Sequence, residues 1–87
     1  GINAAEQAIE LSVYPNPVQQ QLIVSVTAQH PDLGLTLTDL CGRTIIHATL
    51  TKDQYTHTLT TGQLAPGVYL LSVKGKGIQL THKIMKR

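Results

Sequence analysis

Short apolar segments with a period of two are the feature that most restricts the fold of this 87-residue chain. In residues 22–26, Leu22, Val24 and Val26 fall on one side and polar side chains on the other, as in a strand with one buried face. The same alternation recurs between clusters of turn-forming residues, and no segment carries a 3.6-residue apolar stripe. The expected strands are 11–13, 22–26, 35–38, 46–50, 55–60, 68–73 and 78–84. The sequence therefore predicts an all-β fold, a single immunoglobulin-like β-sandwich of about seven antiparallel strands.

The core of such a sandwich has to be aliphatic, because the chain has no Phe, no Trp and only three Tyr. This length leaves room for one core, and not for a second domain or a deep catalytic cleft. A net charge of +2 and few aromatic side chains argue against a nucleic-acid partner. The single cysteine excludes an internal disulfide and a cysteine-based zinc cage. No apolar run approaches the ~18 residues of a membrane span.

The two ends of the chain differ in pattern. Residues 1–8 are small or polar and lack periodicity, so we expect a linker at 1–8 and the sandwich domain at 9–87. Because the chain starts with Gly and not Met, we expect it to be a piece of a longer protein. The strand pattern continues to the other end, so we expect a partner to read it, through a free strand edge or the terminal carboxylate. The alternative is a docked closing strand whose edge is protected by basic residues. The candidate binding residues are Lys83, Ile84, Met85, Lys86 and Arg87.

The segment Tyr14-Pro15-Asn16-Pro17 interrupts the strand pattern. Its two prolines restrict φ and remove two backbone donors, so no strand can run through it. We interpret it as a rigid corner between strands. The alternative is a stiff, exposed knob that a receptor binds.

The segment Asp39-Leu40-Cys41-Gly42-Arg43 predicts a tight hairpin turn. Gly42 can adopt a positive φ, and the Asp39 carboxylate can accept hydrogen bonds from turn amides and pair with Arg43. We expect Cys41, at the tip of this turn, to be partly exposed.

Pro66 and Gly67 are expected to turn the chain into the strand Val68–Val73, which is apolar on both faces and should be central and covered on both sides. Gly67 should hold a backbone angle that a side chain would resist. Tyr69 should bury its ring and direct its hydroxyl to a partner at the rim. Tyr14 is also expected to be buried. We interpret Gly67, Val68 and Tyr69 as structural.

The chain carries no recognisable catalytic pattern. If residues 43–50 and 55–60 form a hairpin, His47 and His57 face opposite sides of the sheet, and no clustered acid or cysteine completes a metal site. Nucleophile elbows and glycine-rich phosphate loops are absent from the sequence. We therefore expect no catalytic residues, no metal and no cofactor, and a non-enzymatic function. The histidines considered for a metal site are His30, His47, His57 and His82.

Four pieces of the chain, in this order, resemble one protein family. They are Tyr14–Pro17, Asp39–Arg43, Leu64–Leu71 and Lys83–Lys86. The chain from Leu11 to Arg87 resembles the C-terminal sorting domain (type A) of cargo proteins of the type IX secretion system of Gram-negative bacteria. Cys41 departs from the polar residue that is commoner at this turn position in the family.

The resemblance implies a secretion signal at the end of a larger protein. Such proteins pass through the periplasm, cross the outer membrane through a dedicated translocon, and reach the cell surface or the medium. The implied partners are the translocon and its shuttle proteins, a cell-surface sortase and the N-terminal cargo domain. In many members the sortase cuts at the front of the domain and joins the cargo to lipopolysaccharide. Residues 83–87 would then be the translocon-recognition residues.

Two other functions stay open at this stage. One is an immunoglobulin-like adhesion or carbohydrate-binding module, which would need an exposed aromatic platform. The other is a structural spacer that stabilises a neighbouring domain. A lone thiol outside the cell can pair between chains, so we also expect a Cys41-linked homodimer on storage and not in native secretions.

Overall fold

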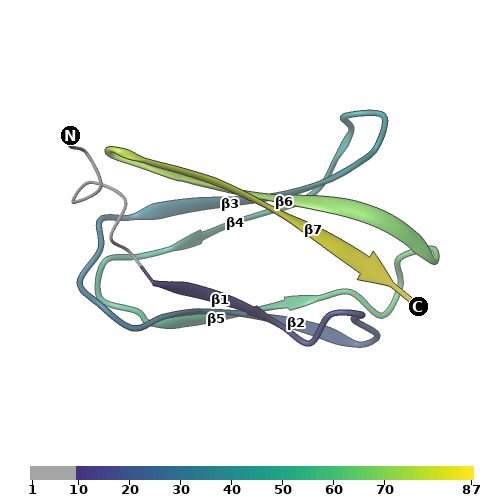
Figure 1. Cartoon of the computed structure of the whole chain (residues 1–87), viewed down its shortest axis with the longest axis horizontal. Helices are drawn as coiled ribbons and strands as arrows, with labels where there is room; N and C mark the ends of the chain where they lie inside the picture. The colour runs from purple at the N-terminus through teal and green to yellow at the C-terminus, as the bar shows by residue number, and fades with distance from the viewer. Residues whose placement is uncertain (1–9) are drawn as a thin grey trace.

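Two antiparallel sheets pack face to face in residues 10–87, the part of the chain that the computed structural model describes (Figure 1). The expected linker, Gly1–Ala8, lies outside these residues. Seven strands are present in the described part, which confirms the predicted all-β, immunoglobulin-like sandwich. They are β1 (Leu11–Tyr14), β2 (Gln21–Val26), β3 (Leu33–Asp39), β4 (Thr44–Leu50), β5 (Thr56–Thr60), β6 (Gly67–Gly75) and β7 (Ile78–Lys86).

The smaller sheet has the strand order β1-β2-β5 and the larger one the order β4-β3-β6-β7. The hairpin of residues 43–50 with 55–60 that was considered for the histidines does not form, because β4 pairs with β3 and β5 pairs with β2. His47 lies opposite Thr36 and His57 opposite Val24, so the two histidines belong to different sheets. The segment 51–55 carries the chain from one sheet to the other.

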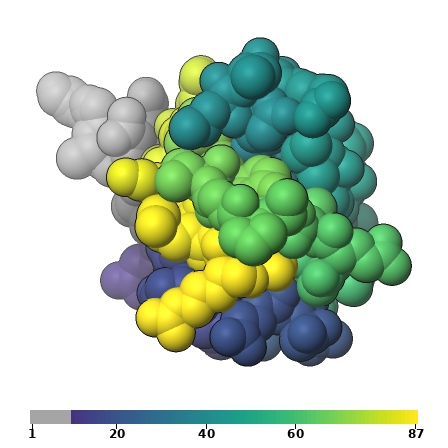
Figure 2. Space-filling model, turned by 90° about the vertical axis from the view of Figure 1, so that its right-hand side faces the viewer, coloured from purple at the N-terminus to yellow at the C-terminus, as the bar shows by residue number. Residues whose placement is uncertain are grey.

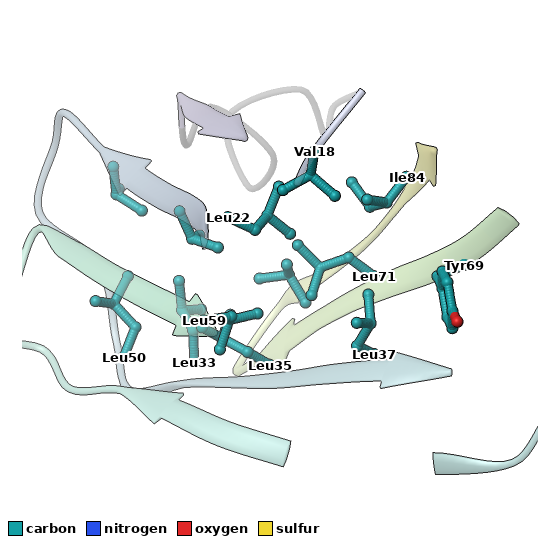
Figure 3. Packing of buried hydrophobic residues seen from close by; sticks show 13 residues of the cluster. Val18, Leu22, Leu33, Leu35, Leu37, Leu50, Leu59, Tyr69, Leu71 and Ile84 are labelled. Carbon is teal, nitrogen blue, oxygen red and sulfur yellow. The ribbon is translucent and has the colours of Figure 1, made fainter. Parts of the chain in front are cut away.

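Apart from Tyr69 the core is aliphatic, and apart from Val18 it comes from the inward positions of both sheets (Figure 3). Alternation places these side chains: successive residues of a strand point to opposite faces, so every second one enters the core. The expected inward sets of β2 and β3 are confirmed. Burial of this set is the main driving force for folding. The buried hydrophobic residues are Val18, Leu22, Val24, Val26, Leu33, Leu35, Leu37, Leu50, Leu59, Tyr69, Leu71, Val73 and Ile84.

The strand β6 is central in its sheet, between β3 and β7, as expected. Within residues 10–87 it is covered on one face only, so the expectation of double coverage is wrong for this part of the chain. Tyr69, Leu71 and Val73 are buried, whereas Val68 and Leu70 on the other face are half-buried. No second layer of residues 10–87 covers the apolar side chains on this outer side of β6.

Tyr14 is 45% exposed, so the expectation that it is buried is wrong. Leu11 and Val13 pack against the core, and alternation then directs Tyr14 outward. It lies opposite Ile23 of β2, on the outer face of the smaller sheet.

The two ends of the sandwich have different connections (Figure 1). One end holds the β1–β2 corner, the β3–β4 turn, the β5–β6 loop and the end of β7; we call it the terminal end. The opposite end holds the other three connections, and there the ring nitrogens of buried His30 lie 2.6 Å from the carbonyl oxygens of Pro31 and Gln54. In residues 10–87 no helix has the length and apolarity that crossing a membrane requires.

Candidate functional site

The terminal end gathers the motifs that the sequence singled out. Figure 2 looks onto it and shows the β3–β4 turn, the β5–β6 loop, the end of β7 and the β1–β2 corner next to one another. The chain brings them together because β1, β3, β5 and β7 all run toward this end in the antiparallel sheets.

The last residues of β7 are held by the β1–β2 corner. Nδ2 of Asn16 donates to the carbonyl of Lys83 (2.9 Å), and Oδ1 of Asn16 accepts from the N–H of Met85 (2.9 Å). The N–H of Val18 donates to the carbonyl of Met85 (2.7 Å), and the N–H of Arg87 donates to the carbonyl of Val18 (3.0 Å). The side-chain amide of Asn16 thus replaces a backbone peptide group that the neighbouring prolines cannot supply.

These bonds occupy the edge of β7 that faces away from β6. Val18 forms an isolated parallel bridge with Lys86, and its side chain is buried. As long as residues 16–18 stay in place, this half of the edge is closed to an added strand. The interpretation of Tyr14–Pro17 as a corner fits the structure, but sequence reasoning missed Asn16 itself. The only sequence signal for Asn16 is a polar amide between two residues that lack a backbone donor.

The five candidate binding residues do not share one environment. Lys83, Met85 and Arg87 are exposed, and Lys86 is half-buried. Ile84 is buried in the core and unavailable to a partner, which leaves it a structural role.

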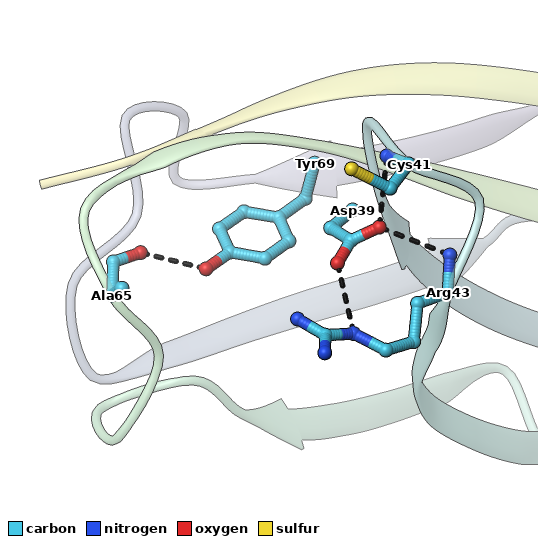
Figure 4. Close-up of polar contacts among 5 residues, drawn as sticks. All are labelled: Asp39, Cys41, Arg43, Ala65 and Tyr69. Atoms are coloured by element: carbon cyan, nitrogen blue, oxygen red, sulfur yellow. Dashed lines mark hydrogen bonds and ion pairs between the residues drawn. The ribbon is translucent and has the colours of Figure 1, made fainter.

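The β3–β4 turn is built around Asp39 (Figure 4). Oδ1 of its carboxylate accepts from the backbone N–H groups of Cys41 and Arg43, both at 2.9 Å, and Oδ2 accepts from Nε of Arg43 at 3.1 Å. The backbone N–H of Arg43 is the main reason why the pKa of Asp39 lies below its usual 3.8, with the Cys41 N–H and the Arg43 charge adding to it against partial burial. Gly42 adopts φ +86°, and Cys41 is exposed, both as predicted.

Tyr69 joins β6 to the β5–β6 loop. Its ring is buried, and its hydroxyl donates to the carbonyl of Ala65 at 2.7 Å, as Figure 4 shows. Gly67 adopts φ +153°, a backbone conformation that L side chains rarely adopt. The structural interpretation of Gly67 and Tyr69 is supported by these contacts.

An open depression of about 480 Å³ adjoins the corner. Its borders include Pro15, Pro17, Ile23 and Arg87. It contains no acid, cysteine or histidine that could act on a bound molecule.

The four histidines do not converge. His30 lies between two loops, His47 contacts the Thr36 hydroxyl at 3.0 Å, and His57 and His82 sit half-buried on different sheets. Within residues 10–87 no group of three or more His, Cys, Asp or Glu residues could hold a metal ion.

The fold and these motifs agree with a comparison against protein families. Residues 12–87 match a family described as the secretion system C-terminal sorting domain. The chain belongs to this family. A comparison with curated proteins found no match. The sorting domain is a type IX secretion signal, which directs a protein to the outer membrane, the cell surface or the medium, and it works with the secretion system and a preceding cargo region.

Proposed function

We propose that this sorting domain is recognised as a folded unit by the outer-membrane translocon and shuttle proteins of the type IX system. It carries its cargo from the periplasm across the outer membrane. A cell-surface sortase then cuts in or just before residues 1–8 and joins the cargo to lipopolysaccharide. The domain performs no reaction itself and is the substrate of the sortase.

One observation carries this proposal: the family match extends over residues 12–87 and so includes all of β2 to β7 and all of β1 except Leu11. The exposed side chains of Lys83, Met85 and Arg87 supply candidate contacts for the translocon, with half-buried Lys86 beside them.

The carbohydrate-binding alternative gains no support from the exposed tyrosines. Tyr14 is 45% and Tyr55 46% exposed. Tyr14 lies on the outer face at the terminal end, whereas Tyr55 is at the opposite end and packs edge-on against His30. They form no common platform for a sugar.

The test fuses residues 1–87 to a periplasmic reporter in a host that has the type IX system. We expect the reporter outside the cell, and retention of it in a strain that lacks the translocon. A parent fusion that stays in the periplasm of the intact host contradicts the proposal. Mass spectrometry of the released domain locates the cut, and a new N-terminus beyond Val13 contradicts a cut near the linker.

Deleting residues 83–87 should block export. The result would not show whether export fails because the translocon contacts are lost or because the domain unfolds. The deletion removes Ile84 from the core and the backbone groups that hold Asn16 and Val18. Lys83→Glu with Arg87→Glu changes only exposed side chains. We expect this double variant to fold like the parent and to lose export about tenfold or more, the loss usual for a binding hot spot.

A further inference from the structure

Apolar side chains gather on the outer face of the larger sheet at its terminal end. Val68 lies opposite Met85, and Leu70 opposite Lys83, in the β6–β7 register. Because Tyr69 and Leu71 point into the core, their neighbours Val68 and Leu70 point outward. Val68 and Leu70 are half-buried, and Met85 is 43% exposed.

The β3–β4 turn adds a second exposed apolar side chain at this end. Leu40 is 68% exposed, and it directly follows Asp39, which lies opposite Tyr69. The turn is held by the Asp39 carboxylate and by backbone bonds from Gly42 to Asp39 (3.0 Å) and from Asp39 to Arg43 (3.1 Å). Because the backbone of this turn is already ordered, binding through Leu40 does not have to order the loop as well. We name Leu40, Val68, Leu70, Lys83 and Met85 the terminal face.

A partner of the terminal face has to bind through side chains. The adjacent backbone edge of β7 is occupied by Asn16 and Val18, so strand addition at Lys83–Arg87 would first have to displace the corner.

The net positive charge of residues 10–87 is concentrated at the same end. Within residues 10–87, the terminal end holds Arg43, Lys83, Lys86 and Arg87 against one acid, Asp39, which already pairs with Arg43. The opposite end balances three cations with three acids: Lys52, Lys74 and Lys76 with Glu10, Asp32 and Asp53. An excess of cations beside apolar residues is complementary to an apolar surface bordered by carboxylates.

We propose that the terminal face docks onto a protein of the secretion machinery that presents an apolar patch bordered by acidic side chains. This inference rests on the proposed function and names the surface and the chemistry of its partner. An anionic membrane fits less well, because membrane-surface binding favours Trp and Phe, and the chain has neither. The exposed tyrosines also lie elsewhere, Tyr14 on the other sheet and Tyr55 at the other end.

The test uses the reporter fusion with Leu40→Glu and Met85→Glu combined. We expect export to fall about tenfold or more, while the melting temperature of the isolated domain stays that of the parent. Tyr14→Glu is the matched control, since Tyr14 is as exposed as Met85 but lies on the other sheet; its export should be unchanged. If the double variant is unstable, Leu40→Gln replaces it in the test, because it changes only one exposed side chain of the turn. Export of this variant should also fall.

The outcomes separate this inference from the proposed function. If the parent fusion is not exported, the proposed function fails. If the parent and the Leu40 and Met85 variants are all exported equally, the function stands and the terminal face is not the docking surface. Equal losses in Tyr14→Glu and the double variant also overturn the assignment.

A second measurement identifies the class of partner. A photo-crosslinker attached to Cys41, the residue after Leu40, should give an adduct with purified translocon, and the double variant should not. The domain should not sediment together with vesicles that contain phosphatidylglycerol. Sedimentation that the double variant abolishes would assign the face to a lipid surface and overturn the protein partner.

Discussion

Loss of the Tyr69 side chain should cost the domain a large part of its stability. Its ring is buried, and its hydroxyl binds Ala65 of the β5–β6 loop. Tyr69→Ala should lower the free energy of unfolding by about 3–5 kcal/mol, and Tyr69→Phe, which loses only the hydrogen bond, by about 1 kcal/mol. A small domain has a total of about 5 kcal/mol or little more, so export of Tyr69→Ala should fail through unfolding. Thermal melts check this: an alanine variant that melts like the parent yet is not exported would make Tyr69 a recognition contact.

Asp39 should make stability depend on pH. The N–H of Arg43, the N–H of Cys41 and the Arg43 guanidinium lower its pKa in the folded state below 3.8. A lowered folded pKa stabilises the domain above the unfolded pKa, and this contribution disappears as the pH falls through the folded value. The free energies of unfolding of the parent and Asp39→Asn should therefore differ most above about pH 4 and converge in stronger acid. A difference that stays constant with pH would contradict a lowered pKa of Asp39 in the folded state.

For single residues, the sequence predicted the burial of side chains well where alternation was applied strictly, and it predicted the β3–β4 turn from its turn-forming residues. Tyr69 and the Asp39 turn are confirmed. Tyr14 was misplaced because it was treated as part of the buried pattern, although Leu11 and Val13 already take the inward positions of β1. Strict alternation would have placed Tyr14 outside.

Among the structural elements, the β1–β2 corner should protect the end of β7. The Asn16 amide makes two hydrogen bonds to the edge of β7, at Lys83 and Met85. Both bonds are exposed, so we expect Asn16→Ala to cost about 1 kcal/mol. The sharper signal is amide hydrogen exchange: the Met85 amide should exchange faster in Asn16→Ala, while the Ile84 amide, on the β6 side, stays slow.

Asn16→Asp is the matched control for this prediction. Its carboxylate can still accept from the Met85 N–H but cannot donate to the Lys83 carbonyl. Protection of Met85 should persist in this variant. Loss of protection at Met85 and Ile84 together would mean that β7 unfolds as a whole and that Asn16 is not a local clamp.

The strands themselves were predictable and their partners were not. Alternation is a local property, so the expected segments agree with the observed strands to within a few residues. The choice between pairing β4 with β5 or with β3 depends on contacts that are not local, so the sequence left the hairpin of residues 43–50 with 55–60 as a condition only, and β4 pairs with β3. The hydrogen bonds of Asn16 to β7 were not predicted for the same reason. Asn16 and its two partners are separated by 67 and by 69 positions in the sequence.

At the scale of the whole molecule, the terminal end was predictable only in part. The sequence identified its four motifs and its basic residues, and the family resemblance is confirmed by the match over residues 12–87. The sequence did not show that the motifs meet at one end of the sandwich. Alternation puts Ile84 on the opposite face of its strand from Lys83 and Met85, but it does not show which of the two faces meets the core. Those facts depend on the order of strands in both sheets.

The exposed thiol at this end leads to a prediction about the association of whole molecules. Cys41 is free, exposed and next to Leu40 of the terminal face. Outside the cell such a thiol can pair between chains, so purified parent should form a disulfide-linked dimer on storage that a non-reducing gel detects and Cys41→Ser abolishes. A disulfide at Cys41 places a second domain over the terminal face, so the dimer should not compete for the translocon, whereas Cys41→Ser should compete like reduced parent. Secretions trapped at once with a thiol-blocking reagent should contain monomer. A dimer in those trapped secretions would show that the pairing belongs to the native state and would contradict a dimer that forms only on storage.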